Sequence, residues 1–127
     1  MRGMSAMRVL VVEDDTDMAE SLKASLAADS HEVDVANDGA AAISFLEHHE
    51  APSAILLDLL MPGIVGTSVL AYLDSKPSLK DVPVAIVSSS PELAPEGRAL
   101  FRKPLKFSRL LEFVRKACGL EGAPGRA

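Results

Sequence analysis

An unbroken apolar run that stops at a single carboxylate constrains this chain more than any other stretch of its sequence. The run is Ile55-Leu56-Leu57, it ends at Asp58, and Pro62-Gly63 follows. A strand without polar alternation is typical of a parallel sheet covered on both faces, and Pro-Gly marks the loop that leaves it. Asp58 is therefore expected at the carboxyl end of a buried strand, the edge where ligands bind in open α/β sheets. An isolated Asp can instead simply start a turn, so other polar residues are needed to distinguish a functional Asp58 from a turn residue.

Four other segments have strand patterns, and helix patterns alternate with them. The predicted strands are Arg8–Val12, His31–Ala36, Val82–Val87 and Ala99–Arg102. The helices are predicted through Met18, Leu22 and Leu26, over Ala40–His49, over about Gly66–Ser75, and through Leu110, Leu111, Val114 and Ala117. Such alternation with right-handed crossovers predicts an α/β fold with a doubly wound, five-stranded parallel sheet.

The polar residues at the predicted helix starts and the three histidines are explained by helix capping and by solvation. Asp15 or Thr16 can cap the first helix, and Ser108 is predicted to cap the last. Three histidines, His31, His48 and His49, have no i, i+4 pair that would favour a metal site, so we expect them to be solvated.

Composition excludes several functions. A net charge of −5 without a basic run argues against nucleic-acid binding. Cys118 is the only cysteine, so an intrachain disulfide is excluded, and we expect a small buried hydrophobe in the last helix. The sequence lacks a signal-peptide pattern and any stretch of transmembrane length, which predicts no membrane partner and a cytoplasmic location.

Polar residues follow the predicted strands at the edge that contains Asp58. Glu13 and Asp14 follow the first strand, Ser88 the fourth, and Lys103 the fifth. Because the carboxyl ends of parallel strands share one edge, these side chains should converge. Each carboxylate pair 4 Å apart repels by roughly 4 kcal/mol at an effective dielectric of 20. A bound cation would relieve this repulsion, and oxygen ligands with open positions suit Mg²⁺.

From about Met7 to Cys118 the sequence resembles the receiver domain of two-component response regulators, which have a flavodoxin-like fold. The motifs that carry the resemblance are Val11-Val12-Glu13-Asp14-Asp15, Asp58-Leu59-Leu60-Met61-Pro62-Gly63 with Gly66 beyond it, Val87-Ser88-Ser89 and Lys103-Pro104. Each is weak alone, but their common order on strand ends is specific. The resemblance divides the chain into a disordered extension (1–6), a receiver domain (7–118) and a flexible tail (119–127).

The resemblance also implies roles for the site residues. Asp58 would accept a phosphoryl group from a histidine kinase or phosphotransfer protein, Lys103 would pair with the phosphoryl oxygens, and the Ser88 hydroxyl would turn toward them. The implied Mg²⁺ ligands are Glu13, Asp14, Asp58 and the backbone carbonyl of Leu60. Such a protein catalyses its own phosphorylation and dephosphorylation and is not a turnover enzyme on an external substrate.

Two departures from the family pattern fall on its usual signalling face. The connection after Ser88 is shorter by about two helical turns, which predicts a short, distorted or absent fourth helix. Leu100 occupies the aromatic switch position, and Phe101 falls on a core position. Output is therefore expected to bypass the aromatic switch, and the segment 89–98 is either a loop that phosphorylation orders or a fixed cover.

Three functions remain open. The favoured one is a stand-alone receiver that signals by binding proteins, since no output domain follows Cys118 in this sequence. The alternative is a pseudo-receiver, an interaction module that is independent of phosphorylation. A phosphohydrolase with an aspartyl nucleophile would require a second Asp where this chain has Leu60.

Overall fold

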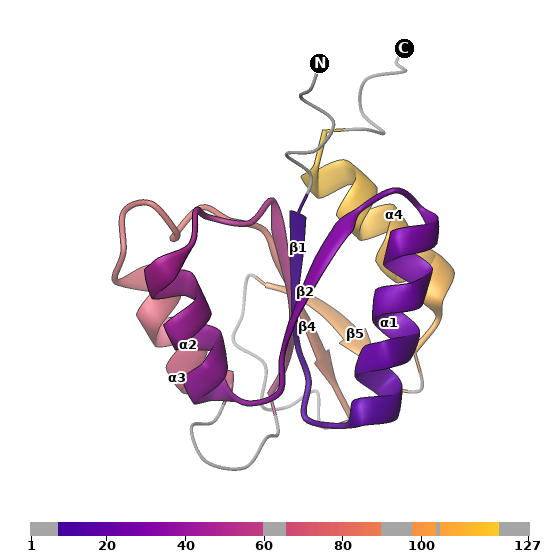
Figure 1. Ribbon diagram of the computed structural model, residues 1–127, viewed down its shortest axis with the longest axis horizontal. Helices are drawn as coiled ribbons and strands as arrows, with labels where there is room; N and C mark the ends of the chain where they lie inside the picture. The colour runs from indigo at the N-terminus through magenta and orange to yellow at the C-terminus, as the bar shows by residue number, and fades with distance from the viewer. Residues whose placement is uncertain (1–7, 60–65, 90–97, 104, 120–127) are drawn as a thin grey trace.

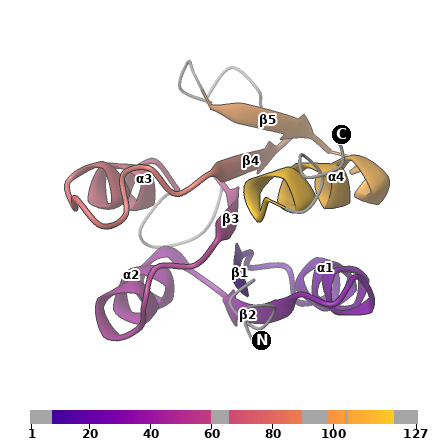
Figure 2. The same cartoon turned by 90° about the horizontal axis from the view of Figure 1, so that it is seen from above.

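Five parallel strands form one sheet in the computed structural model, which describes residues 8–59, 66–89, 98–103 and 105–119. The strands are β1 (Arg8–Val12), β2 (Glu32–Ala36), β3 (Ala54–Asp58), β4 (Val84–Ser88) and β5 (Ala99–Arg102). The helices are α1 (Thr16–Ala28), α2 (Gly39–His48), α3 (Gly66–Asp74) and α4 (Phe107–Ala117). Figure 1 shows the sheet between its helices. The strand order is β2-β1-β3-β4-β5, as the view from above shows (Figure 2), and every neighbouring pair is parallel. The predicted doubly wound sheet is confirmed.

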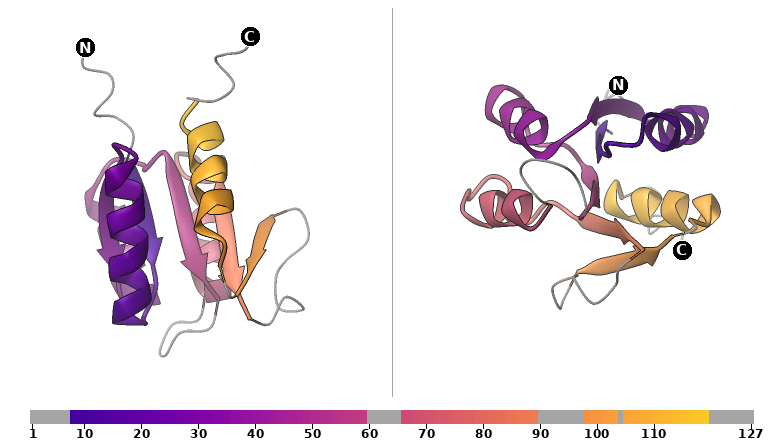
Figure 3. Two further views of the ribbon diagram at one scale, coloured as in Figure 1. Left: turned by 90° about the vertical axis from the view of Figure 1, so that its right-hand side faces the viewer. Right: turned by 90° about the horizontal axis from the view of Figure 1, so that it is seen from below.

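Helices cover both faces of this sheet. Figures 2 and 3 show α1 and α4 on one face and α2 and α3 on the other. Alternate strand residues serve the two layers: Leu10 and Ile55 pack with the α2/α3 side, whereas Val9 and Leu56 pack with the α1/α4 side. All residues of β3 and β4 are buried. The continuous apolar runs in the sequence thus reflect two covered faces.

Several boundaries differ from or refine the predictions. The side chain of Asp15, not Thr16, caps α1 by accepting a hydrogen bond from the backbone N–H of Met18 at 3.1 Å. The prediction that Ser108 caps the last helix is wrong, because α4 already begins at Phe107, whose side chain packs against the α1/α4 core. Strand β4 begins at Val84, one residue after Pro83, which lacks a backbone donor.

His31 is buried, so the prediction that it is solvated is wrong. Its side chain is 0% exposed, and its Nε2 lies 3.2 Å from Oδ2 of Asp29, which also accepts two hydrogen bonds from Arg115. The reason is alternation: His31 shares a strand face with Val33 and Val35, which pack on the α1/α4 core. The alternation His31-Val33-Val35, which starts one residue before the strand, thus places the His31 side chain on the covered face of the sheet.

The other two histidines are exposed as predicted. Nδ1 of His48 lies 2.8 Å from the carbonyl oxygen of Ser44, and Nδ1 of His49 lies 2.9 Å from that of Phe45. Cys118 directly follows α4 and is half-buried against the α1/α4 core, and this burial raises the pKa of its thiol despite a hydrogen bond with Ser53.

Several expectations concern residues outside the described ranges. These are the disordered extension 1–6, the Pro62-Gly63 turn, most of the segment 89–98 and all but the first residue of the tail 119–127. Within the described ranges no helix lies between β4 and β5. The helices seen in those same ranges are all too short or too polar to cross a bilayer.

The packing of α4 can be tested at Leu110, which is 1% exposed. Leu110→Ala should lower the free energy of unfolding by about 2–5 kcal/mol, because it removes buried methyl groups and leaves a cavity. Urea unfolding followed by circular dichroism measures this loss. The control Glu112→Ala changes an exposed residue of the same helix and should have an effect below about 0.5 kcal/mol; equal losses in both variants would contradict the packing described.

Candidate functional site

The predicted polar residues meet at the carboxyl edge of the sheet. Asp58 is the last residue of β3 and Ser88 the last of β4, Glu13 and Asp14 follow β1, and Lys103 follows β5. Parallel pairing of β1 with β3, β3 with β4 and β4 with β5 aligns these ends. The convergence expected from the sequence is therefore present. Leu60, whose carbonyl was predicted as a metal ligand, lies outside the described residues.

Three carboxylates form the centre of this edge. Glu13, Asp14 and Asp58 each offer an oxygen within 4.8 Å of the others. Glu13 and Asp58 are buried, at 2% and 4% exposure, whereas Asp14 is exposed. The set combines hard oxygen donors, excess negative charge and an opening to solvent at Asp14, which fits a hydrated Mg²⁺ ion.

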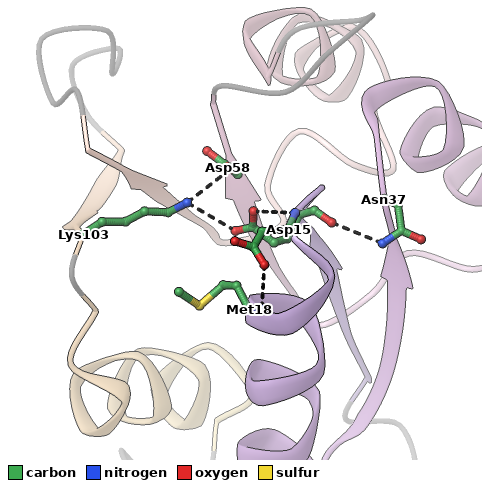
Figure 4. Close-up of polar contacts among 6 residues, drawn as sticks. Asp15, Met18, Asn37, Asp58 and Lys103 are labelled. Carbon is green, nitrogen blue, oxygen red and sulfur yellow. Dashed lines mark hydrogen bonds and ion pairs between the residues drawn. The ribbon is translucent and has the colours of Figure 1, made fainter.

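Lys103 links two of these carboxylates. Its Nζ lies 3.4 Å from Oδ2 of Asp58 and 3.6 Å from Oε1 of Glu13, as Figure 4 shows for Asp58. Partial burial lowers the pKa of the ammonium, but the charges of Asp58 and Glu13 outweigh it and raise that pKa above its ordinary value. Lys103 therefore remains a fixed positive charge beside Asp58.

Backbone and side-chain hydrogen bonds hold Glu13 in place. Its N–H donates to the carbonyl oxygen of Ala36 at 3.0 Å, and its own carbonyl oxygen accepts from Nδ2 of Asn37 at 3.3 Å. Oε2 accepts from the N–H of Asp15 at 3.2 Å. No sequence pattern predicts this contact of Asn37 with Glu13, since only the pairing of β1 with β2 brings the two loops together.

The environment of Glu13 favours its protonated form. Burial raises the pKa of its carboxyl to about 7; the nearby charge of Asp58 adds to this, and the hydrogen bond from Asp15 and the charge of Lys103 oppose it. Ionisation of a buried carboxylate beside a second one is thus unfavourable. A cation bound at this edge would offset this cost.

Ser88 is buried at 1% exposure at the end of the strand next to Asp58. Its carbonyl oxygen accepts a hydrogen bond from the N–H of Lys103 at 3.1 Å, which extends the β4–β5 pairing by one step. This bond fixes where the Lys103 side chain leaves the backbone. The two residues are therefore positioned as a unit.

Comparison with protein families and curated sequences identifies the class. The response regulator receiver domain model matches residues 9–115. The transcriptional regulatory protein PrrA of Mycobacterium leprae is 41% identical over 87 residues, which are 68% of this chain and 36% of that protein. The response regulator MprA of the same organism is 30% identical over 116 residues, 86% of this chain and 50% of that protein. The chain thus spans half or less of these relatives.

Solved structures agree in fold. The response regulator TrrA of Thermotoga maritima, in complex with Mg(2+)-BeF, is 28% identical with a TM-score of 0.75 over 87% of this chain and 97% of that one. The receiver domain of a sensor histidine kinase from Pseudomonas aeruginosa, with a magnesium ion in its active site cleft, has a TM-score of 0.79 at 21% identity over 89% and 98%. The second likeness shows the fold alone.

Fold and acidic edge together define a receiver of two-component signal transduction. The chain belongs to the response regulator receiver domain family. Receiver domains are phosphoacceptors and not turnover enzymes on external substrates. They bind Mg²⁺ at an acidic pocket and interact with histidine kinases or phosphotransfer proteins.

Replacement of Asp14 tests whether its carboxylate contributes to Mg²⁺ binding. Asp14→Ala should weaken Mg²⁺ binding roughly tenfold or more, because it deletes an accessible oxygen donor, and should leave the metal-free protein equally or more stable. Isothermal titration measures the affinity. Ser88→Ala is the comparison, since it removes no carboxylate; equal Mg²⁺ affinities in wild type and Asp14→Ala would contradict the assignment.

The pKa of Glu13 predicts how stability depends on pH without metal. Because folding raises this pKa from 4.5 to about 7, the stabilising contribution of protonated Glu13 is complete below 4.5 and is lost as pH rises through 7. Relative to Glu13→Gln, the wild type should therefore lose roughly 2–3 kcal/mol between pH 5 and pH 8. Urea unfolding in EDTA at both pH values measures the difference, with the exposed Asp17→Asn as control; a difference independent of pH would refute it.

Proposed function

We propose that this chain is a response regulator receiver that accepts a phosphoryl group on Asp58. The supporting observation is the buried carboxylate of Asp58 at the end of β3, with the ammonium of Lys103 3.4 Å away and Glu13 and Asp14 beside it. A histidine kinase or phosphotransfer protein would supply the group in a Mg²⁺-dependent reaction.

The step is a phosphoryl transfer between two protein side chains. A carboxylate oxygen of Asp58 attacks the phosphorus of a phosphohistidine in line, the new P–O bond forms as the P–N bond breaks, and the imidazole leaves and takes up a proton. Hydrolysis of the aspartyl phosphate by water would return Asp58 to its starting form. Both steps use the protein's own residue, so the chain undergoes the reaction instead of turning over a substrate.

Charge neutralisation is the main requirement of this step. Negative charge spreads over the equatorial phosphoryl oxygens, and fixed positive groups aimed at them stabilise it. Lys103 meets this requirement, because its ammonium already contacts Asp58 and its pKa is raised. Ser88, buried at the neighbouring strand end, would donate its hydroxyl to a phosphoryl oxygen.

The acidic cluster would hold the metal. Glu13, Asp14 and Asp58 are the carboxylate donors, and the backbone carbonyl of Leu60 is proposed as a further ligand. Bound Mg²⁺ supplies positive charge and orientation to the phosphoryl oxygens. The chain's own contribution is to bury Glu13 and Asp58 and leave Asp14 open to solvent, which admits a hydrated ion together with its phosphoryl ligand.

Signalling would then occur by protein–protein interaction in the cytoplasm. The exposed Leu100, at the family's aromatic switch position, has no ring or hydroxyl to swing inward, and Phe101 is turned into the core against Phe113. These positions support an output that does not use the aromatic switch. The proposed domain runs over residues 7–118, with 1–6 as an extension and 119–127 as a tail.

Phosphorylation of Asp58 can be measured directly. Incubation with acetyl phosphate and Mg²⁺ should add one phosphoryl group by intact mass, and Asp58→Asn should abolish this addition, because the amide is not a nucleophile. The exposed Asp17→Asn serves as the control and should label like wild type.

Two results would decide against the proposal. Unchanged labelling of Asp58→Asn would show that another residue accepts the phosphoryl group. Absence of labelling in the wild type, with Mg²⁺ bound and also with a phosphorylated histidine donor, would favour the pseudo-receiver, whose interactions are independent of phosphorylation.

A further inference from the structure

The loop that carries Glu13 and Asp14 needs support from outside β1, because the strand itself ends at Val12. The N–H of Glu13 donates to the carbonyl oxygen of Ala36 at 3.0 Å, one step beyond the paired residues of β1 and β2. The next acceptor along the chain is the carbonyl oxygen of Glu13, which belongs to the peptide unit that joins Glu13 to Asp14. Because a peptide unit is planar, a contact that fixes this oxygen also fixes the backbone from which the Asp14 side chain leaves.

Asn37 supplies that contact from the neighbouring loop. Its Nδ2 donates to the carbonyl oxygen of Glu13 at 3.3 Å (Figure 4). Asn37 directly follows β2, whose last residue Ala36 is aligned with Val12 at the end of β1. The two loops therefore leave the sheet side by side, and Asn37 joins the β2–α2 loop to the loop of the acidic edge.

The backbone on both sides of Asn37 is held by hydrogen bonds. On one side Ala36 accepts the N–H of Glu13. On the other side Asp38 caps α2, since its Oδ1 accepts from the N–H of Ala41 at 2.7 Å. A residue between a strand end and a helix cap has little freedom to shift, so its side chain can act as a fixed support.

An amide suits this position because it donates a hydrogen bond without carrying charge. The oxygens of Glu13, Asp14 and Asp58 favour a divalent cation through their negative charge. A lysine or arginine at position 37 would offset that charge, and an ionised aspartate or glutamate could not donate to a carbonyl oxygen. Asn37 is the only residue of the sequence with a side-chain amide. It therefore supports the loop and leaves the charge of the acidic edge unchanged.

We propose that Asn37 is a positioning residue for the Mg²⁺ site. It holds the Glu13–Asp14 peptide so that the Asp14 carboxylate is presented to the ion together with that of Asp58, and it contributes no ligand of its own. Asp14 depends on this support more than Glu13 does, because Asp14 is exposed, whereas Oε2 of Glu13 accepts a hydrogen bond from the N–H of Asp15 at 3.2 Å. Groups that orient the ligands of a metal commonly affect its affinity. The inference rests on the Mg²⁺ site of the proposed function, but not on phosphorylation of Asp58.

Isothermal titration of the full chain with Mg²⁺ tests this role. Asn37→Ala should weaken Mg²⁺ binding about threefold or more, because the peptide unit loses the bond that orients it. Asn37→Gln keeps the amide and should bind Mg²⁺ more tightly than Asn37→Ala does. The control Ser44→Ala removes a neutral polar side chain from an exposed position on α2, and it should change the affinity less than about twofold. None of these changes alters the net charge, and circular dichroism confirms that each variant is folded.

Labelling kinetics distinguish a positioning role from a general disturbance of the site. With acetyl phosphate as donor, the Mg²⁺ concentration that gives half the maximal rate should rise in Asn37→Ala by the same factor as in the titration. The rate at saturating Mg²⁺ should stay within about twofold of wild type, because the ion, once bound, meets the same ligands. A residue needed only for folding would lower the saturated rate as well.

The inference is overturned by equal Mg²⁺ affinities of wild type and Asn37→Ala, by equal weakening in Ser44→Ala and Asn37→Ala, or by an Asn37→Gln variant as weak as Asn37→Ala. A lower saturated rate without a change in the half-saturating Mg²⁺ concentration would overturn it too. The titration requires no phosphorylation, so the two proposals can fail separately. Mg²⁺ binding that depends on Asn37 in a chain that is not labelled refutes the proposed function alone, whereas labelling with a Mg²⁺ affinity independent of Asn37 refutes the positioning role alone.

Discussion

The contact of the Lys103 ammonium with Asp58 and Glu13 is the interaction on which the site depends. Glu13 and Asp58 are both buried, and burial, with the charge of Asp58 adding to it, raises the pKa of the Glu13 carboxyl. Lys103 offsets part of this charge from the adjacent strand end, while Asp14 leaves the cluster open to solvent. The metal-free site is therefore held together but still carries net negative charge. That residual charge is what makes it suited to a divalent cation.

The sheet is the reason why this contact exists. Asp58 and Lys103 are far apart in the sequence, and only the order β3-β4-β5 with parallel register brings their strand ends together. The N–H of Lys103 donates to the carbonyl oxygen of Ser88, so the last backbone bond of the ladder also positions the lysine. Buried, two-faced strands resist a shift of register, because a one-residue slip would turn every side chain to the opposite layer.

Regular patterns allowed most of the fold and site to be predicted. Apolar runs located β3 and β4, and polar residues at or directly after strand ends located Glu13, Asp14, Asp58, Ser88 and Lys103. The prediction was wrong where a local rule was applied without its packing partner. Ser108 is a good capping residue, but burial of Phe107 starts α4 earlier, and His31 has a polar ring, but its strand face is covered.

The sequence by itself determined which residues could carry the chemistry and on which strand ends they lie, because period and turn signals act over a few neighbouring residues. Only the tertiary structure decided their electrostatics. Three contacts connect residues of separate strand ends. Glu13 is buried beside Asp58, Lys103 contacts both carboxylates, and Asn37 donates a hydrogen bond to the carbonyl oxygen of Glu13. Such effects depend on distance in space, which local sequence patterns do not encode.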